Sequence, residues 1–192
     1  MVGAVLLLAA LAAVPARAHD PLFTAAENRE LVEELAAQYL PGIRPGVGAA
    51  WVHQESRWKA TAVSRKGARG PLQIMPETAR DIRRACRMPE LDLSSMSSSL
   101  RGGFCYARLV RRQIGPMATA EDLNEAMFRA YNGGAGWILK ERRAAKQKGQ
   151  DDALAENLRP HCRDLRSPDS CEENLSYYQY IQRWYKKYYR AW

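Results

Sequence analysis

The 192-residue sequence predicts a single, mainly α-helical domain, with at most a minor β-hairpin at residues 57 to 72. Two observations favour this fold class. Apolar side chains recur every three or four residues along most segments, which is the spacing of an amphipathic helix. No segment outside 57 to 72 has the pattern of a convincing strand. The length suits one domain with its own hydrophobic core.

The first eighteen residues differ in composition from the rest of the chain. An uncharged, Leu- and Ala-rich run from Val2 to Val14 precedes Ala16-Arg17-Ala18, a small-x-small cleavage pattern. We therefore expect residues 1 to 18 to be a signal peptide, cleaved before His19. The run is shorter than the about 20 residues that a membrane span needs. A retained N-terminal anchor, in transient contact with a membrane, is the alternative.

The predicted helices begin with residues 19 to 40, where Thr24 would be the N-cap of a capping box and Pro41-Gly42 the end. A loop at 41 to 48 and a short buried helix at 49 to 56 follow. Gly67, Gly70 and Pro71 predict irregular structure at 57 to 75. Pro76 suits the first turn of a helix that continues to about Arg87. Further helices are expected at 98 to 114, 121 to 131, 135 to 148, 153 to 158 and 173 to 192, with a disulfide-stapled loop at 160 to 171.

Four cysteines behind an export signal indicate two disulfides. Three pairings are possible, and we favour the pairs that are neighbours in sequence, Cys86–Cys105 and Cys162–Cys171. A zinc site is disfavoured because the spacings lack C-x-x-C and only His161 adjoins a cysteine. We therefore expect no metal.

The chain is basic, with a formal charge of +8. Such a charge favours polyanionic partners without choosing among nucleic acid, anionic lipid and anionic wall polymer, and it also suits a merely solvated surface. A basic patch resembles a nucleic-acid-binding face by composition, but a solvated helix is the favoured interpretation, so nucleic acid is not an expected partner. The patch consists of Lys140, Arg142, Arg143, Lys146 and Lys148.

The most informative segment is residues 55 to 76, which carries one carboxylate in a cationic, glycine-rich stretch. Between Ser56 and Ile74 there is no Asp or Glu. A lone acid in such a stretch could donate a proton at a cleft. By residue type alone, Glu55 is more often a surface group paired with Arg57 or Lys59.

The same segment resembles the signature of the lytic transglycosylases. A second motif resembles the Ala-Tyr-Asn-x-Gly of that family, and a third resembles its Glu-Thr-x-x-Tyr with Asn in place of Thr. Pro71-Leu72 stands where the family usually has Leu-Met. The matching residues are Glu55-Ser56, Ser64, Gly67-Ala68-Arg69-Gly70 and Gln73-Ile74-Met75-Pro76, then Ala130-Tyr131-Asn132-Gly133-Gly134, then Glu173-Asn174-Leu175-Ser176-Tyr177.

The resemblance implies a lysozyme-like fold of the goose-type lysozyme and lytic transglycosylase kind, with residues 19 to 192 as the catalytic domain. It implies cleavage of the β-1,4 bond between N-acetylmuramic acid and N-acetylglucosamine of peptidoglycan glycan strands, without water or cofactor. Glu55 would act as acid and then as base, leaving 1,6-anhydromuramic ends. The implied location is the periplasm of a Gram-negative bacterium, for wall turnover, a secretion system or a phage assembly. The implied substrate-binding residues are Ser64, Gln73, Met75, Tyr131, Asn132 and Tyr177.

Two alternatives remain open from the sequence. A hydrolytic muramidase would need a second carboxylate, for which Glu77, Asp81, Glu90 and Asp92 are candidates. A catalytically inactive wall-binding or assembly protein could keep the same fold. A catalytic acid also needs a raised pKa, so we expect Glu55 in an apolar pocket beside Trp51 or Trp58, whereas Arg57, Lys59 and His53 could oppose the shift.

Overall fold

The computed structural model describes residues 19–192, and the predicted signal peptide lies outside the described residues. The described chain forms nine α-helices and a terminal π-helical turn, and it contains no sheet, so the predicted mainly α-helical class is confirmed. The helices are α1 Pro21–Glu27, α2 Arg29–Tyr39, α3 Pro45–Ser56, α4 Pro76–Ala85, α5 Met96–Ile114, α6 Ala120–Gly133, α7 Ala135–Gln147, α8 Ala155–Leu165 and α9 Pro168–Trp184, followed by η1 Tyr185–Tyr189.

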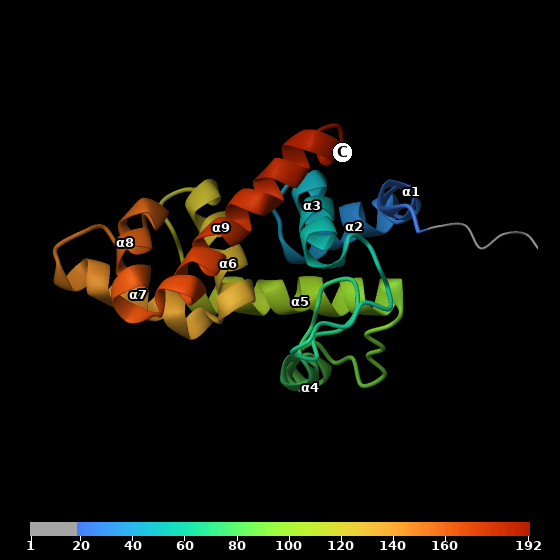
Figure 1. Cartoon of the computed structure of the whole chain (residues 1–192), viewed down its shortest axis with the longest axis horizontal. Helices are drawn as coiled ribbons and strands as arrows, with labels where there is room; N and C mark the ends of the chain where they lie inside the picture. Colours follow the sequence, from blue (N-terminus) through green and yellow to red (C-terminus); the bar gives the residue numbers. More distant parts are fainter. Residues whose placement is uncertain (1–18) are drawn as a thin grey trace, which may run out of the picture.

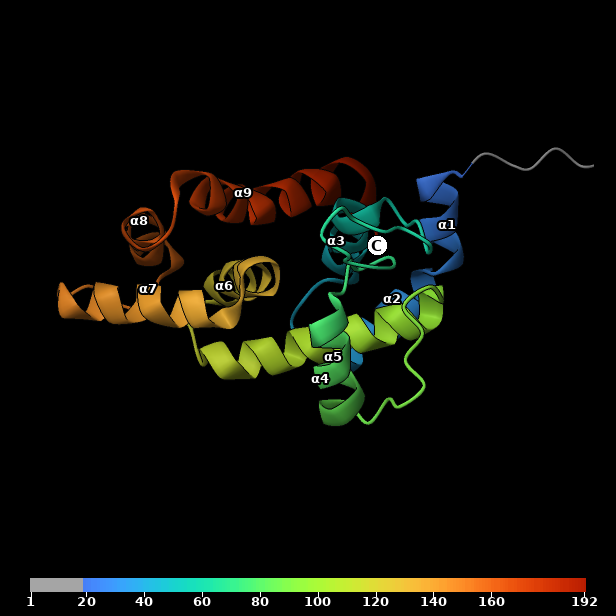
Figure 2. The same ribbon diagram turned by 60° about the horizontal axis from the view of Figure 1, so that its bottom comes forward.

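The helices gather into two groups around the long helix α5. Helices α1 to α4 lie at one end of the molecule and α7 and α8 at the other, while α9 runs above α5 and joins the two ends (Figures 1 and 2). Helix α3 packs against α2, α9 and η1 between them. The short helix that carries Glu55 is therefore enclosed by segments from both halves of the sequence.

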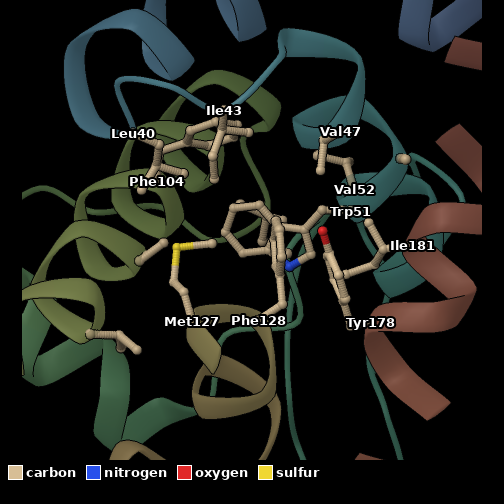
Figure 3. Packing of buried hydrophobic residues seen from close by; sticks show 14 of the residues in the cluster. Leu40, Ile43, Val47, Trp51, Val52, Phe104, Met127, Phe128, Tyr178 and Ile181 are labelled. Atoms are coloured by element: carbon tan, nitrogen blue, oxygen red, sulfur yellow. The ribbon is translucent and has the colours of Figure 1, made fainter. Parts of the chain in front are cut away.

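Trp51 of α3 lies at the centre of the hydrophobic core (Figure 3). Its ring is fully buried and lies 5.3 Å from Phe104, 5.5 Å from Phe128 and 4.7 Å from Tyr131, measured between ring centroids. Aromatic side chains bury large apolar areas, so this contact set fixes α3 against α5 and α6. The position of Glu55, four residues after Trp51, is set by this packing.

The first predicted helix is divided in the structure at Asn28, and its predicted cap is wrong. Asp20, not Thr24, caps the N-terminus, because its carboxylate accepts from the backbone N–H groups of Leu22 and Phe23 at 2.9 and 3.3 Å. Asp is a strong N-cap and Pro21 directly after it suits the first helical position. The Thr24 hydroxyl donates to the Asp20 carbonyl oxygen instead.

The predicted loop at 41 to 48 is wrong in its second half, because α3 begins at Pro45. Two of its glycines, Gly46 and Gly48, lie within α3 and serve close packing. A Cβ at Gly46 would lie 2.1 Å from the Tyr189 carbonyl oxygen, so only glycine lets η1 approach so closely. Helix α5 begins at Met96, two residues earlier than expected, because the Ser95 side chain accepts from the backbone N–H of Ser98 as its N-cap.

The predicted loop at 160 to 171 is also wrong. Helix α8 continues past Pro160 to Leu165, and α9 begins at Pro168. Pro160 lies in the interior of α8, where its missing N–H costs one backbone hydrogen bond without ending the helix. The Cys162–Cys171 disulfide consequently joins two helices, α8 and α9, rather than closing a loop, and Cys86–Cys105 joins the end of α4 to α5.

Residues 57 to 75 are irregular, as expected. The minor hairpin is reduced to isolated bridges between Val63 and Arg69 and between Arg69 and Ile74. Positive φ angles at Gly67, Gly70 and Gln73 turn the backbone too often for a ladder to extend. Within residues 19–192, no helix combines the length and the apolar character that a membrane crossing requires.

Candidate active site

A cleft of about 570 Å³ opens at the C-terminal end of α3. Its walls come from the end of α3, the 64–75 loop, the start of α4, the middle of α5, the end of α6 and α9. Five of the six predicted substrate-binding residues line it together with Glu55, and the sixth, Tyr177, touches the Glu55 carboxyl. The lining residues are Glu55, Ser64, Arg65, Lys66, Ala68, Gln73, Ile74, Met75, Thr78, Tyr106, Tyr131, Asn132 and Glu173.

Glu55 lies in the last turn of α3, half-buried at the cleft. The helix ends at Ser56, and the next two residues, Arg57 and Trp58, adopt left-handed conformations with φ of 53° and 64°. This turn directs the exposed Arg57 out of the helix, while Trp58 returns to the core. The C-terminal end of a helix carries partial negative charge, which disfavours a carboxylate there.

Two aromatic side chains hold the Glu55 carboxyl group. The Tyr177 hydroxyl of α9 donates a short hydrogen bond to Oε1 of Glu55. The Trp51 indole N–H in turn donates to the Tyr177 oxygen at 3.0 Å. Because the indole can only donate, the Tyr177 proton is left for the carboxyl group. Both aromatic residues are buried, so the orientation of the carboxyl is fixed by the core.

Burial raises the pKa of Glu55 to about 7, although the hydrogen bonds from Tyr177 and Trp51 lower it. At neutral pH a large fraction of the carboxyl groups therefore carry a proton. His53 does not oppose the raised pKa of Glu55, because it carries no charge at neutral pH. Burial and the nearby Arg57 and Lys187 lower the pKa of His53 to about 4. Of the two expected tryptophans, Trp51 is the one at the site.

The loop that faces Glu55 is held by its own side chains. The Ser64 hydroxyl accepts from the Ala68 N–H at 3.0 Å, and the Gln73 amide nitrogen donates to the Gly70 carbonyl oxygen at 2.9 Å. Gly70 has φ of 77°, and a Cβ there would lie 2.0 Å from the Leu93 carbonyl oxygen. Ser64 and Gln73 thus shape the wall that they line, and the carbonyl oxygen of the Gln73 amide remains for a ligand.

The opposite wall comes from the end of α6. The Tyr131 hydroxyl donates to the Leu72 carbonyl oxygen at 3.0 Å, which ties α6 to the loop across the cleft. Asn132 follows it, with its amide exposed in the cleft. Met75 borders the cleft from the N-cap of α4. The first two motifs therefore meet in space, although about 60 residues separate them in sequence.

Comparison with known proteins shows which family this arrangement represents. The family model described as the Transglycosylase SLT domain matches residues 34–154, which is most of the described chain and includes Glu55 and Asn132. The chain belongs to the SLT transglycosylase domain family. The match ends before Tyr177, so the third element of the site lies outside the matched region.

Two relatives are both named membrane-bound lytic murein transglycosylase F. The protein of Actinobacillus pleuropneumoniae serotype 5b is 36% identical over 101 residues, which is 53% of this chain and 20% of the relative. That of Thiobacillus denitrificans is 33% identical over 115 residues, or 60% of this chain and 23% of the relative. The SLT chain therefore spans about a fifth of the length of these relatives.

A solved structure supports the lysozyme-like fold. The 70 kDa soluble lytic transglycosylase of Escherichia coli superposes with a TM-score of 0.58 at 24% identity, over 82% of this chain and 24% of that one. This likeness concerns the fold.

The structure adds cleft residues that the sequence prediction did not include in the site. Tyr106 of α5 lies 5.7 Å from Tyr131 between ring centroids, and burial raises its pKa. Glu173 of α9 places a second carboxylate at the cleft. Glu173 opens the third motif, a signal that could have found it, whereas nothing local in the sequence marks Tyr106. Among the described residues, none of the four acids expected as a second carboxylate lines the cleft.

Proposed function

We propose that this SLT domain is a peptidoglycan lytic transglycosylase, with Glu55 as its single acid and base. The observation that carries this proposal is the Glu55 carboxyl group, which burial holds near pKa 7 beside the Tyr177 hydroxyl at an open cleft. A general acid works best when its pKa lies near the working pH. The names of the two relatives, which refer to murein, support the choice of substrate.

In the proposed reaction the protonated Glu55 gives its proton to the glycosidic oxygen between N-acetylmuramic acid and N-acetylglucosamine. The bond from that oxygen to the muramic anomeric carbon breaks, and positive charge develops on the sugar ring. The Glu55 carboxylate then takes the proton of the muramic C6 hydroxyl, whose oxygen bonds to the anomeric carbon. The 1,6-anhydro end forms, Glu55 is protonated again, and no water is consumed.

The other cleft residues would bind the glycan. We assign Ser64, Gln73, Met75, Tyr131 and Asn132 to the walls of the sugar site, and Tyr177 to the orientation of the acid. Gln73 and Asn132 offer amide groups, and Tyr131 and Met75 offer apolar surface, which is the mixture that sugar rings need. No cofactor or metal enters the proposed reaction.

The product tests this function most directly. Purified sacculi would be digested in oxygen-labelled water and the fragments measured by mass spectrometry. We expect anhydromuramic ends, lighter than reducing ends by one water molecule and free of the label. Labelled reducing ends would instead show a hydrolytic muramidase, for which Glu173 is the carboxylate in the cleft. Intact sacculi would indicate a catalytically inactive wall-binding protein.

We further propose that residues 1–18 direct export and that residues 19–192 act on glycan strands in the periplasm. Wall turnover, a secretion system and a phage assembly are the settings that such a location fits. Expression with the full leader and N-terminal sequencing of the periplasmic protein tests this. A chain that begins at His19 supports cleavage, whereas a membrane-bound chain that keeps its leader supports the anchor.

A further inference from the structure

Asn174 is a buried amide of α9 that lies one residue after the cleft residue Glu173 and is 1% exposed. Its side chain makes three hydrogen bonds. Oδ1 accepts from Nε of Arg129 at 3.2 Å, and Nδ2 donates to the Arg129 carbonyl oxygen at 2.8 Å. Nδ2 also donates to Oδ1 of Asn132 at 3.0 Å. Asn174 thus connects a buried arginine to an exposed amide of the cleft.

These partners fix the orientation of both amides. A guanidinium group can only donate and a backbone carbonyl oxygen can only accept, so Arg129 allows one orientation of the Asn174 side chain. The remaining N–H of Asn174 is directed at the Asn132 side chain. Within that amide only the oxygen Oδ1 can accept it. The Asn132 amide nitrogen is therefore turned away from Asn174, and Asn132 presents hydrogen-bond donors to the cleft that it lines.

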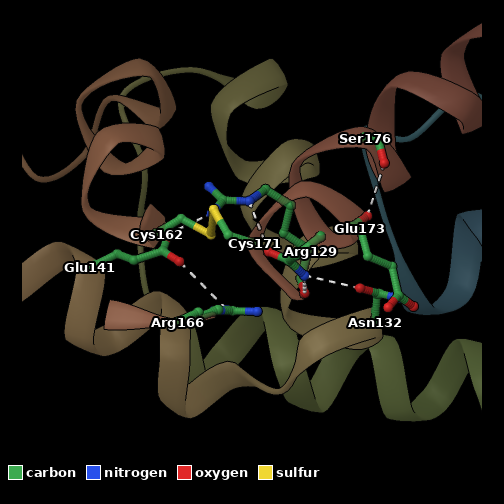
Figure 4. Close-up of a disulfide and its surroundings, with 9 residues drawn as sticks. Arg129, Asn132, Glu141, Cys162, Arg166, Cys171, Glu173 and Ser176 are labelled. Carbon is green, nitrogen blue, oxygen red and sulfur yellow. Dashed lines mark hydrogen bonds and ion pairs between the residues drawn. A yellow bond between two sulfur atoms is a disulfide. The ribbon is translucent and has the colours of Figure 1, made fainter. Parts of the chain in front are cut away.

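The base of this chain of contacts is buried and charge-paired. Arg129 is fully buried and its Nη2 lies 2.5 Å from the Glu141 carboxylate, which Arg166 approaches at 3.5 Å. Figure 4 shows Arg129, Glu141 and Arg166 next to the Cys162–Cys171 disulfide, with Asn132 on the far side. A buried charge of this kind keeps its partners because an unpaired one is costly.

The chain also makes room for the contact at Gly133. A Cβ at this position would lie 2.7 Å from Nδ2 of Asn174. Glycine directly after Asn132 is thus required for the buried amide to approach the end of α6. The second motif and the third motif therefore meet through one hydrogen bond, from Asn174 to Asn132.

We infer that Asn174 is a positioning residue that sets Asn132 as a donor to a carbonyl oxygen of the glycan, the group found in its N-acetyl and lactyl substituents. The inference rests on the proposed function. The Thr that is usual in the resembling motif has a single hydroxyl proton, which could serve Asn132 or the Arg129 carbonyl oxygen but not both. In this chain the amide serves both, so the orientation of Asn132 is held without competition.

Binding of a soluble peptidoglycan tetrasaccharide to the Glu55→Gln protein tests the inference by calorimetry, free of turnover. In that background Asn174→Ala and Asn132→Ala should each weaken binding by about tenfold, the size of one hydrogen bond. The double variant should bind no more weakly than Asn132→Ala, because Asn174 acts through Asn132. Additive losses would overturn the inference.

Two further variants guard against a simple loss of structure. Asn132→Asp keeps an oxygen for Asn174 but removes the donors from the cleft, so it should bind at least as weakly as Asn132→Ala with the buried contacts intact. Binding equal to that of the parent would overturn the donor role. Gln182→Ala is the matched control, since it removes a hydrogen bond from the same helix to Tyr178, away from the cleft, and should leave the dissociation constant unchanged.

The two proposals fail differently. Unchanged binding in Asn174→Ala, with anhydromuramic products from the unmodified protein, would overturn the role of Asn174 alone. No binding to the Glu55→Gln protein and no cleavage by the unmodified protein would overturn the proposed function and this inference together.

Discussion

Helix α3 carries two ionisable side chains, His53 and Glu55, in parallel surroundings. His53 contacts the Tyr189 hydroxyl through Nδ1 at 2.7 Å, and the Trp58 indole donates to the same oxygen at 3.0 Å. Glu55 has the equivalent pair in Tyr177 and Trp51. Each group thus meets a tyrosine of the C-terminal segment whose oxygen also accepts from an indole.

The two sites differ in access to solvent. His53 is 5% exposed, and its ring lies 4.5 Å from Trp184 and 5.5 Å from Tyr188 between centroids. Glu55 opens onto the cleft. Burial drives both groups toward their neutral forms, lowering the pKa of His53 to about 4 and raising that of Glu55 to about 7. The same pairing of a tyrosine with an indole therefore lies within the core at one site and orients a carboxyl group at the cleft at the other, where we propose that this carboxyl group is the proton donor.

Replacement of the acid should give the largest difference between the sites. Glu55→Gln keeps the shape of the side chain but removes the proton that is transferred, so kcat on sacculi should fall by about 10³-fold or more. His53→Gln should leave kcat within about threefold of the unmodified value, because His53 touches no part of the cleft. Release of soluble fragments measures both, and wall clearance by Glu55→Gln would remove Glu55 from the mechanism.

The pH dependence of stability should separate the two groups next. Ionisation of folded Glu55 is unfavourable, so its contribution to stability falls as pH rises from 4.5 to about 7. Protonation of folded His53 is unfavourable, so its contribution falls as pH drops from 6.5 to about 4. Between pH 4.5 and pH 6.5 the contributions of the two groups to stability therefore change in opposite directions in the unmodified protein.

Glu55→Gln removes the contribution of Glu55 to the pH dependence of stability and should leave that of His53. Relative to the unmodified protein, its free energy of unfolding should increase between pH 4.5 and 7 by at most about 3 kcal/mol. Urea denaturation at a series of pH values measures the difference. A difference that does not change with pH would mean that Glu55 ionises as freely in the folded protein as in the unfolded chain.

The two tyrosines should separate activity from stability. Tyr177→Phe frees the Glu55 carboxyl to rotate and should lower kcat by roughly tenfold, the size of one hydrogen bond to a reacting group. Because the lost bond lowers the pKa of Glu55, the alkaline fall of the activity profile should move to higher pH. Tyr189→Phe should destabilise the fold by about 1–3 kcal/mol through the unpaired His53. An equal loss of kcat in the two variants would contradict the comparison.

The two indoles should give the smallest effect. Trp51→Phe removes the donor to Tyr177 but keeps an aromatic ring in the core, so kcat should fall by roughly three- to fivefold. Trp58→Phe removes the donor to Tyr189 and should leave kcat unchanged. Both variants lose core volume, so melting temperatures should fall in both and provide the internal control.

The sequence predicted most of the fold and most of the residues that meet at the cleft. Helical periodicity placed the helices from α4 to α7 within a few residues, and the first motif placed Glu55, Ser64 and Gln73 together. The two wrongly predicted loops concern glycine and proline, whose meaning depends on distant partners. Gly46 was interpreted as part of a loop because nothing near it in sequence shows that the Tyr189 backbone would press against it.

The remaining parts of the site could not be predicted because tertiary contacts create them. Tyr106 reaches the cleft from the middle of a helix with no local signal. The parallel between His53 and Glu55 depends on two tyrosines more than 120 residues away in sequence. Asn174 looked like a mere departure from a motif, and its role appears only when Arg129 and Asn132 stand on either side of it.

The pKa of the Glu55 side chain tests the central claim, which is that the fold holds this carboxyl group neutral at the cleft. Carbon NMR titration of protein labelled in its glutamate carboxyl groups measures it, and the Glu55 signal is assigned as the one missing from Glu55→Gln. A midpoint at about 7 would agree with the structure. A midpoint at about 4.5, the ordinary glutamate value, would contradict it and leave the cleft without a prepared acid.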